Sequence, residues 1–222
     1  MFYVIVEFRN VSFPRASSSS STPAPALAPI DRRPLAALKR RNVAGDDIFT
    51  VDGVLTAREC ADIIRCIESK NAFAPSTSRG PAFGEAWRRN GRFQTDDDAF
   101  AKALWRSSGV GQFFKGGLDD ASGLNPNIRV YRYVTGEHFG PHIDERVMAF
   151  GRWSAYTALF YLSDVEDGGR TIFYDAKGRP EHFVEPRVGR ALFFRHGVHC
   201  CEHEGEQVRR GVKYVLRSDV LF

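Results

Sequence analysis

Short β-prone segments separated by turn residues dominate the chain from Ile128 to Phe222. Each segment is rich in Val, Ile, Tyr or Phe, and Gly, Pro or Asp residues separate it from the next. Six such segments cover residues 128–134, 154–165, 171–176, 182–186, 191–196 and 213–222. Many short strands of this kind predict a sheet-based domain, either a sandwich or a jelly roll.

The region before these segments predicts two helices and one short strand. Residues 48–55 indicate a strand and a turn, and residues 56–69 carry apolar residues at helical spacing. Thr56 followed by Glu59 matches a capping box at the start of this helix. A second helix is expected over residues 97–106.

Residues 71–95 are rich in Gly, Pro, Ser and Arg, which predicts a long loop. Trp87, Asn90 and Arg92 would be displayed on it as a candidate substrate rim. The structural alternative is an arginine that pairs with loop carbonyls.

The order of these elements constrains the architecture. Two helices followed by a run of strands predict a mainly β fold in which supporting helices pack on one sheet. A jelly roll satisfies this order.

Basic residues are concentrated at the N-terminus. Residues 1–42 contain seven Lys or Arg residues against Glu7 and Asp31, so this segment carries +5, whereas the whole chain carries +4. The remainder therefore carries −1, which argues against nucleic-acid binding by the folded part. We expect residues 1–42 to be a disordered basic leader or a transit segment, and residues 43–222 to form one domain.

Cysteine usage and hydrophobic runs indicate the compartment. The four cysteines lack the spaced framework of a small secreted domain, and Cys200 and Cys201 are adjacent. No apolar run approaches the roughly 18 residues that a membrane-spanning helix needs. We expect an intracellular, cytoplasmic protein with no membrane span, and organelle import as the alternative.

His142 and Asp144 predict a metal site. They are two positions apart, so in extended backbone their side chains project to the same face. One more histidine would complete a two-histidine, one-carboxylate triad, which is typical of non-haem iron(II) and leaves coordination positions open. His-x-Asp alone is weak evidence, because a hydrogen-bonded loop pair has the same spacing.

Three histidines, His196, His199 and His203, are candidates for the third ligand. With the neighbouring cysteines they could also form a zinc-binding patch, but a structural zinc site draws its ligands from two spaced pairs. Only His203 begins the pattern His-x-Gly-x-x-Val-x-x-Gly-x-Lys, which ends at Lys213.

Several of these segments together resemble the prolyl 4-hydroxylase-like branch of the 2-oxoglutarate/iron(II) oxygenases. The resemblance extends from about Asp46 to Phe222. It implies a double-stranded β-helix, which is a cupin-like jelly roll with helices supporting one sheet. The segments that carry it are residues 131–144, 156–174, 189–196 and 203–220.

The resemblance assigns the metal ligands and the main cosubstrate contact. It implies that His142, Asp144 and His203 hold the iron. It also implies that Lys213 binds the distal carboxylate of 2-oxoglutarate. This role suits a buried lysine, because a buried cation without a counter-ion is costly and the cosubstrate supplies that counter-ion.

Further cosubstrate contacts follow from the same resemblance. Tyr133 and Thr171 match a tyrosine and a threonine that belong to the cosubstrate pocket of the family. Tyr131, two residues from Tyr133 on the same strand face, is the alternative, or it packs in the core. Arg217 is the second candidate for the anchor, against the preferred interpretation of a surface ion pair.

These assignments imply an oxidoreductase that uses iron(II), 2-oxoglutarate and O2, with ascorbate as a family-level expectation. The leading hypothesis is hydroxylation of a prolyl or other side chain in a protein or peptide, with succinate and CO2 as coproducts. One alternative is an oxygenase of a small molecule. Another is a catalytically silent, cupin-like binding module. The sequence leaves the oligomeric state open.

Overall fold

A computed structural model describes Leu27, Ile30, residues 38–115 and residues 120–222. The expected disorder of the leader concerns residues that for the most part lie outside this set. None of the helices within these ranges is long and apolar enough to cross a membrane.

The expected domain boundary at residues 42 and 43 lies inside a strand. β1 (Arg40–Ala44) pairs with β2 (Ile48–Val51) in antiparallel register, starting with Arg40 opposite Val51. Leu27 and Ile30 are buried in the main hydrophobic cluster. Chain that precedes residue 43 therefore contributes to the fold, because strand pairing and apolar burial begin before that point.

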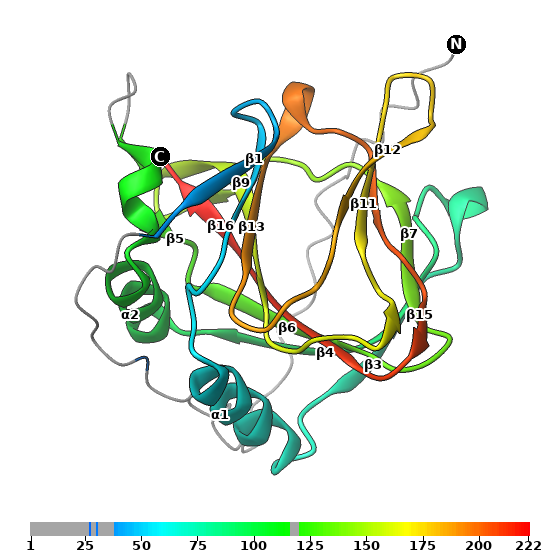
Figure 1. Cartoon of the computed structure of the whole chain (residues 1–222), viewed down its shortest axis with the longest axis horizontal. Coiled ribbons are helices and arrows are strands. Elements are labelled where there is room, and N and C mark those ends of the chain that lie inside the picture. Colours follow the sequence, from blue (N-terminus) through cyan, green and yellow to red (C-terminus); the bar gives the residue numbers. More distant parts are fainter. Residues whose placement is uncertain (1–26, 28–29, 31–37, 116–119) are drawn as a thin grey trace, which may run out of the picture.

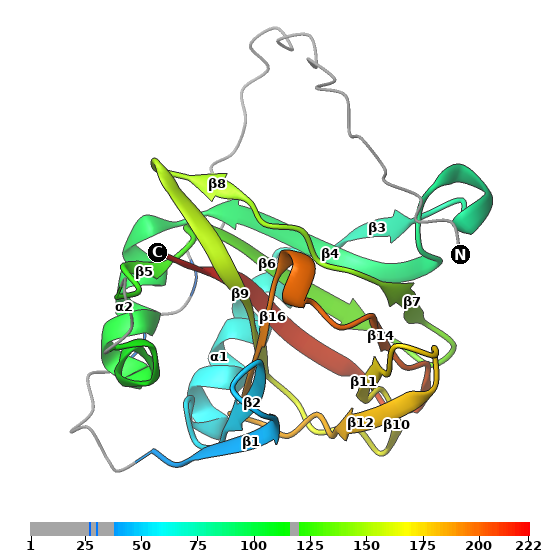
Figure 2. The same ribbon diagram turned by 90° about the horizontal axis from the view of Figure 1, so that it is seen from above.

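Antiparallel strands form a nearly closed barrel (Figures 1 and 2). Along the main path of the sheet, the strand order is β1, β2, β13 (Ala191–Arg195), β9 (Arg152–Tyr161), β16 (Lys213–Leu221), β6 (Asn127–Tyr133), β4 (Arg88–Asp96), β7 (His138–His142), β14 (His203–Gly205), β11 (Thr171–Tyr174) and β12 (Pro180–Val184). The short strands are β3 (Ala74–Thr77), β5 (Gly123–Leu124), β8 (Met148–Ala149), β10 (Asp167–Gly168) and β15 (Val208–Arg210).

The predicted fold class is confirmed, since each of the six β-prone segments contains a strand of this barrel. The two faces of the sheet bury different sets of side chains, because successive strand residues point to opposite sides. Along β16, Leu216 and Val220 belong to the cluster under the helices, whereas Val215 belongs to the cluster inside the barrel. The barrel interior therefore receives Lys213, Val215 and Arg217 from one strand.

Two helices cover the outer face of the sheet (Figure 1). α1 (Ala57–Glu68) begins with the predicted capping box: Thr56 Oγ1 accepts from the Glu59 backbone N–H, and the Glu59 carboxylate accepts from the Thr56 backbone N–H. Such a cap stabilises a helix by about 1 kcal/mol. α2 (Asp98–Ser108) starts one residue later than predicted. The short 3₁₀ helices are η1 (Pro81–Phe83), η2 (Val110–Phe114) and η3 (Gly197–His199).

The prediction of a long loop over residues 71–95 is wrong. This stretch contains β3 and most of β4, which pair with each other, and β4 also pairs with β6 in the body of the sheet. Asn90 and Arg92 lie on β4, and Asn90 is buried. The strand is hard to detect because its inward positions are polar, so apolar alternation is missing.

Candidate metal centre and cosubstrate pocket

Strand pairing brings the two predicted histidine ligands together. His142 ends β7 and His203 begins β14, and the two residues are direct partners in this antiparallel pair. Asp144 follows in the loop after β7, where it is buried. One ligand atom from each of these three residues lies within 4.8 Å of the other two.

The backbone fixes the orientation of both imidazole rings. His142 Nδ1 lies 2.8 Å from the carbonyl oxygen of Gly140, and His203 Nδ1 lies 2.9 Å from that of Cys201. Each Nδ1 must donate, because a carbonyl oxygen can only accept. The Nε2 atoms face the Asp144 carboxylate at 3.7 and 3.6 Å. Second-shell bonds of this kind commonly orient metal-binding histidines.

Burial and neighbouring charges give His142 and His203 different pKa values. Burial lowers the pKa of His142 to about 3, with help from the neighbouring His203. Burial also opposes protonation of His203, but hydrogen bonds to Asp144 and Cys200 outweigh it and raise its pKa to about 9. In the metal-free protein the Asp144 carboxylate therefore favours the protonated form of His203. A divalent cation would take the place of that proton, as metal binding to histidine generally does.

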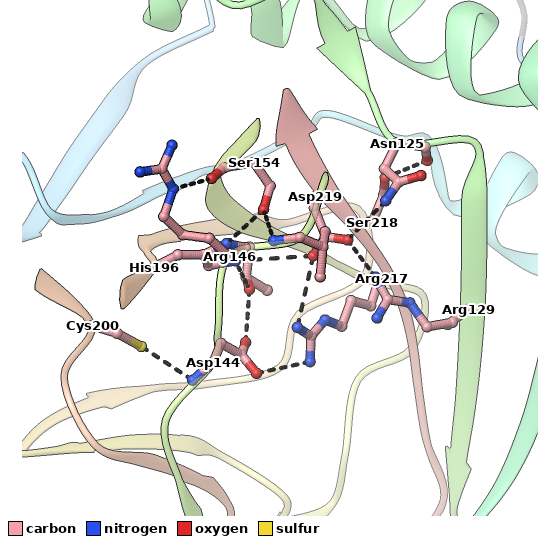
Figure 3. Close-up of polar contacts among 12 residues, drawn as sticks. Asn125, Arg129, Asp144, Arg146, Ser154, His196, Cys200, Arg217, Ser218 and Asp219 are labelled. Atoms are coloured by element: carbon pink, nitrogen blue, oxygen red, sulfur yellow. Dashed lines mark hydrogen bonds and ion pairs between the residues drawn. The ribbon is translucent and has the colours of Figure 1, made fainter. Parts of the chain in front are cut away.

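The Asp144 carboxylate is held from two sides (Figure 3). Its Oδ2 accepts from the Thr157 hydroxyl at 2.7 Å, and its Oδ1 lies 3.0 Å from Arg217 Nη1. Burial opposes ionisation of Asp144, but Arg217 and the histidines lower its pKa well below the usual range. The interpretation of Arg217 as part of a surface ion pair is wrong, because its side chain is only 14% exposed and points into the barrel toward Asp144 and Asp219.

Lys213 lines a cavity together with His142, Asp144 and His203. It is 4% exposed, and in the described part of the chain no carboxylate forms an ion pair with it. Its Nζ lies 5.5 Å from the ring centre of Tyr133, its register partner on β6, and 5.7 Å from that of Tyr161. Burial lowers the pKa of Lys213 to about 8.

Tyr133, Tyr131 and Thr171 line the cavity that holds Lys213 and the triad. The Thr171 hydroxyl bonds the Tyr161 hydroxyl at 2.7 Å. Burial raises the pKa of Tyr133, so its hydroxyl stays protonated and can donate. The structure thus brings the predicted cosubstrate residues together, and Tyr131 lies beside Tyr133 with ring centres 6.4 Å apart.

The two remaining histidine candidates lie outside the triad. His196 is buried, and both of its ring nitrogens have hydroxyl partners: Nδ1 lies 3.0 Å from Ser154 Oγ and Nε2 lies 2.6 Å from Thr157 Oγ1. His199 is exposed on η3. Neither nitrogen of His196 is therefore available to a metal at this site.

A groove of about 750 Å³ opens beside the metal triad. It runs between the segment 76–86 and the end of β7, and its lining includes Arg88, Phe139 and both His142 and Asp144. Of the candidate rim residues, Trp87 is 56% exposed next to the groove, whereas Asn90 is buried and neither Asn90 nor Arg92 lines the groove.

Arg88 is a functional candidate that sequence reasoning missed. Its guanidinium lies 3.6 Å from the ring centre of Phe139, whose ring stacks on His142 at 3.7 Å. In the described part of the chain, no carboxylate pairs with Arg88. The only sequence signal was its position two residues before Asn90, on what proves to be the same strand face.

The donor set fits iron(II) and the dicarboxylate 2-oxoglutarate. Two imidazoles and one carboxylate form the facial triad that suits non-haem iron. Lys213 is a buried cation that lacks a carboxylate partner among the described residues, and such a group suits an anionic ligand.

Comparisons with known proteins agree with this site. Residues 128–218 match the family model described as the 2OG-Fe(II) oxygenase superfamily. Probable prolyl 4-hydroxylase 11 of Arabidopsis thaliana is 40% identical over 70 residues, which cover 30% of this chain and 24% of that protein. Probable prolyl 4-hydroxylase 7 of the same plant is 25% identical over 175 residues, covering 66% and 52%. The chain thus spans about a quarter to a half of these relatives.

Solved structures share the fold. A viral collagen prolyl hydroxylase from Paramecium Bursaria Chlorella virus-1, in complex with 2OG, matches with a TM-score of 0.59 and 18% identity over 80% of this chain and 97% of that chain. A Pseudomonas putida prolyl-4-hydroxylase matches with a TM-score of 0.55 and 19% identity, over 81% and 95%. Residues 128–218 therefore match the 2OG-Fe(II) oxygenase superfamily, and the chain is similar to prolyl 4-hydroxylases in sequence and shares the fold of prolyl hydroxylases.

Proposed function

We propose that this protein is an iron(II)- and 2-oxoglutarate-dependent dioxygenase that hydroxylates a prolyl or other side chain of a protein or peptide. One observation carries the proposal. The His142, Asp144 and His203 cluster shares a single cavity with the buried ammonium group of Lys213. A metal triad and a cation in one cavity suit a cosubstrate that binds metal at one end and carries a carboxylate at the other.

The residues of the chain have distinct tasks in this reaction. Lys213 binds the distal carboxylate of 2-oxoglutarate, and Tyr133 donates a hydrogen bond beside it. The apolar barrel interior around Val215 and Phe194 excludes water from the cosubstrate. Bound iron(II), with 2-oxoglutarate and O2, would supply the oxidising chemistry, in which succinate and CO2 form as the substrate C–H bond is hydroxylated.

The open groove supports a polymeric substrate. Its volume of about 750 Å³ suits an extended segment of several residues, and it borders both His142 and Asp144. Arg88 on its wall offers N–H donors to carbonyl oxygens of such a segment. The similarity to probable prolyl 4-hydroxylases supports proline as the residue to test first.

The test is peptide hydroxylation followed by mass spectrometry. Iron-loaded protein, 2-oxoglutarate and O2 are incubated with proline-rich peptides, and with matched peptides in which alanine replaces proline. The proposal expects one added oxygen atom per modified residue on the proline peptides, dependent on 2-oxoglutarate. The assignment of a peptide substrate would be overturned if no peptide changed the rate of succinate formation and if free amino acids or other small molecules were hydroxylated instead.

Ascorbate and the compartment are parts of the same proposal. We propose that ascorbate supports sustained turnover by keeping the iron reduced, which predicts slower loss of activity when it is added. We also propose a cytoplasmic location, supported by the free thiols of Cys200 and Cys201, which suit a reducing environment. Imaging of the tagged full chain tests this location, and an organellar signal would contradict it.

A further inference from the structure

A metal ligand on a loop needs support from other elements. Asp144 lies in the segment between β7 and β8, outside any strand or helix. Its backbone makes two contacts with the segment around η3: its N–H donates to Cys200 Sγ at 3.4 Å, and its carbonyl accepts from Gly197 N at 3.3 Å. Neither contact fixes the carboxylate itself.

A series of hydrogen bonds between buried side chains, those of Ser154, His196 and Thr157, ends at this carboxylate (Figure 3). The Thr157 hydroxyl has one proton, and it must donate it to Asp144 Oδ2, because an ionised carboxylate can only accept. The Thr157 oxygen is then an acceptor for His196 Nε2 at 2.6 Å, so the His196 proton lies on Nε2.

The other nitrogen of His196 completes the assignment. Nδ1 is unprotonated in this tautomer and accepts from the Ser154 hydroxyl at 3.0 Å. Ser154 Oγ in turn accepts from the backbone N–H of Val147 at 2.9 Å. All of these hydrogen bonds therefore donate in the same direction. Val147 N–H donates to Ser154, and Ser154 donates to His196. His196 donates to Thr157, which donates to Asp144.

The members of this series sit on rigid elements of the barrel. Thr157 and Ser154 belong to β9, and His196 follows β13, the neighbouring strand. The side chains of Ser154, Thr157 and His196 are buried, so water does not compete for these bonds. A carboxylate oxygen can accept a second bond, so the bond from Thr157 leaves Oδ2 able to bind a cation.

We infer that Thr157 and His196 are positioning residues that hold the Asp144 carboxylate in place for metal binding, with Ser154 fixing the His196 tautomer. Sites of this design are pre-organised, and the loss of an outer partner typically weakens metal binding by about 10- to 100-fold. The inference rests on the proposed function only in taking His142, Asp144 and His203 as the metal ligands.

The test is a titration of metal-free protein with Co(II), read from the ligand-field absorption bands, with no cosubstrate present. Thr157→Val keeps the shape of the side chain and removes the hydroxyl. It is expected to weaken Co(II) binding about 10- to 100-fold and to shift the bands. Thr157→Ser keeps the hydroxyl and should restore both. Thr50→Val, on β2, is the matched control at a buried threonine and should behave as wild type.

A second variant and a stability measurement separate positioning from folding. Thermal unfolding of each metal-free variant shows whether it is folded. Ser154→Ala, which does not touch Asp144, is expected to give a smaller loss of Co(II) affinity by releasing the His196 tautomer. Wild-type affinity and bands in folded Thr157→Val, or in Ser154→Ala if Thr157→Val does not fold, would overturn the inference.

The proposed function fails on a different result. If wild-type protein does not bind Co(II), or if His142→Ala binds it as well as wild type does, the metal triad itself is wrong. If wild type binds Co(II) through the triad and Thr157→Val matches it, only the positioning role is wrong.

Discussion

Arg217 and Asp144 face each other inside the barrel, with Nη1 of the arginine 3.0 Å from Oδ1 of the aspartate. Arg217 also lies 3.7 Å from Asp219, which accepts from Arg129 at 2.6 Å (Figure 3). Burial opposes the charge on Arg217, but Asp144 and Asp219 outweigh it and raise its pKa. Two buried carboxylates thus share one guanidinium next to the metal triad.

Removal of this arginine should destabilise the metal-free protein. Arg217→Met leaves Asp144 and Asp219 without their shared cation, and a buried pair broken from one side typically costs about 3–5 kcal/mol. Urea denaturation of metal-free protein measures the change. The control is Arg210→Met, which breaks an exposed ion pair with Glu166 and should cost at most about 1 kcal/mol. Equal effects of the two variants would contradict this prediction.

Lys213 is predicted to bind the cosubstrate and not the metal. Lys213→Met keeps the length of the side chain and removes its charge, so 2-oxoglutarate affinity should fall by about 30-fold or more, which corresponds to the roughly 2 kcal/mol or more that a buried charge partner contributes. Co(II) affinity should stay near the wild-type value. Calorimetric titrations measure both, with the surface variant Lys102→Met as control. Wild-type 2-oxoglutarate affinity in Lys213→Met would remove Lys213 from the site.

Cosubstrate binding should weaken in alkaline solution. Burial lowers the pKa of Lys213 to about 8, so in free protein the ammonium is lost as pH rises through that value. The dianion binds the protonated form, and its affinity should therefore fall by up to about tenfold per pH unit above pH 8. Arginine stays charged throughout this range. If Lys213→Arg still binds 2-oxoglutarate, its affinity should be nearly independent of pH; a wild-type profile that is flat to about pH 9.5 would contradict the assignment.

Arg88 is predicted to bind the substrate in the groove. Arg88→Gln should raise KM for a hydroxylated peptide by about tenfold or more, since a hydrogen bond to a charged donor contributes about 1.5–3 kcal/mol. Arg89→Gln is the matched control, because Arg89 is next in sequence but is exposed and points to the other side of β4. Steady-state kinetics on both variants decide the question. An equal KM for both would leave Arg88 with a packing role against Phe139.

The sequence was informative where apolar periodicity or a motif was present. The six β-prone segments and the Thr56 capping box were predicted because their signals are local. Sequence motifs also predicted that His142 and His203 share a metal site. The structure brings them together because β7 pairs with β14.

Other features could not be predicted because they depend on contacts distant in sequence. β4 carries Arg88, Asn90 and Arg92 on one face, so it resembles a loop in composition. Arg217 appeared to be a surface residue, since its buried partners come from the loop after β7 and from Asp219. Thr157 and His196 meet only because β9 pairs with β13.

The most direct test of the account is succinate formation from 2-oxoglutarate by anaerobically iron-loaded protein after oxygen is admitted. Slow turnover of 2-oxoglutarate in the absence of substrate would allow this assay before the substrate is known. We predict succinate from wild type, and none above background from His142→Ala, His203→Ala or Lys213→Met at low 2-oxoglutarate. The absence of both succinate and iron-dependent 2-oxoglutarate binding in folded wild-type protein would contradict the account and favour a catalytically silent barrel.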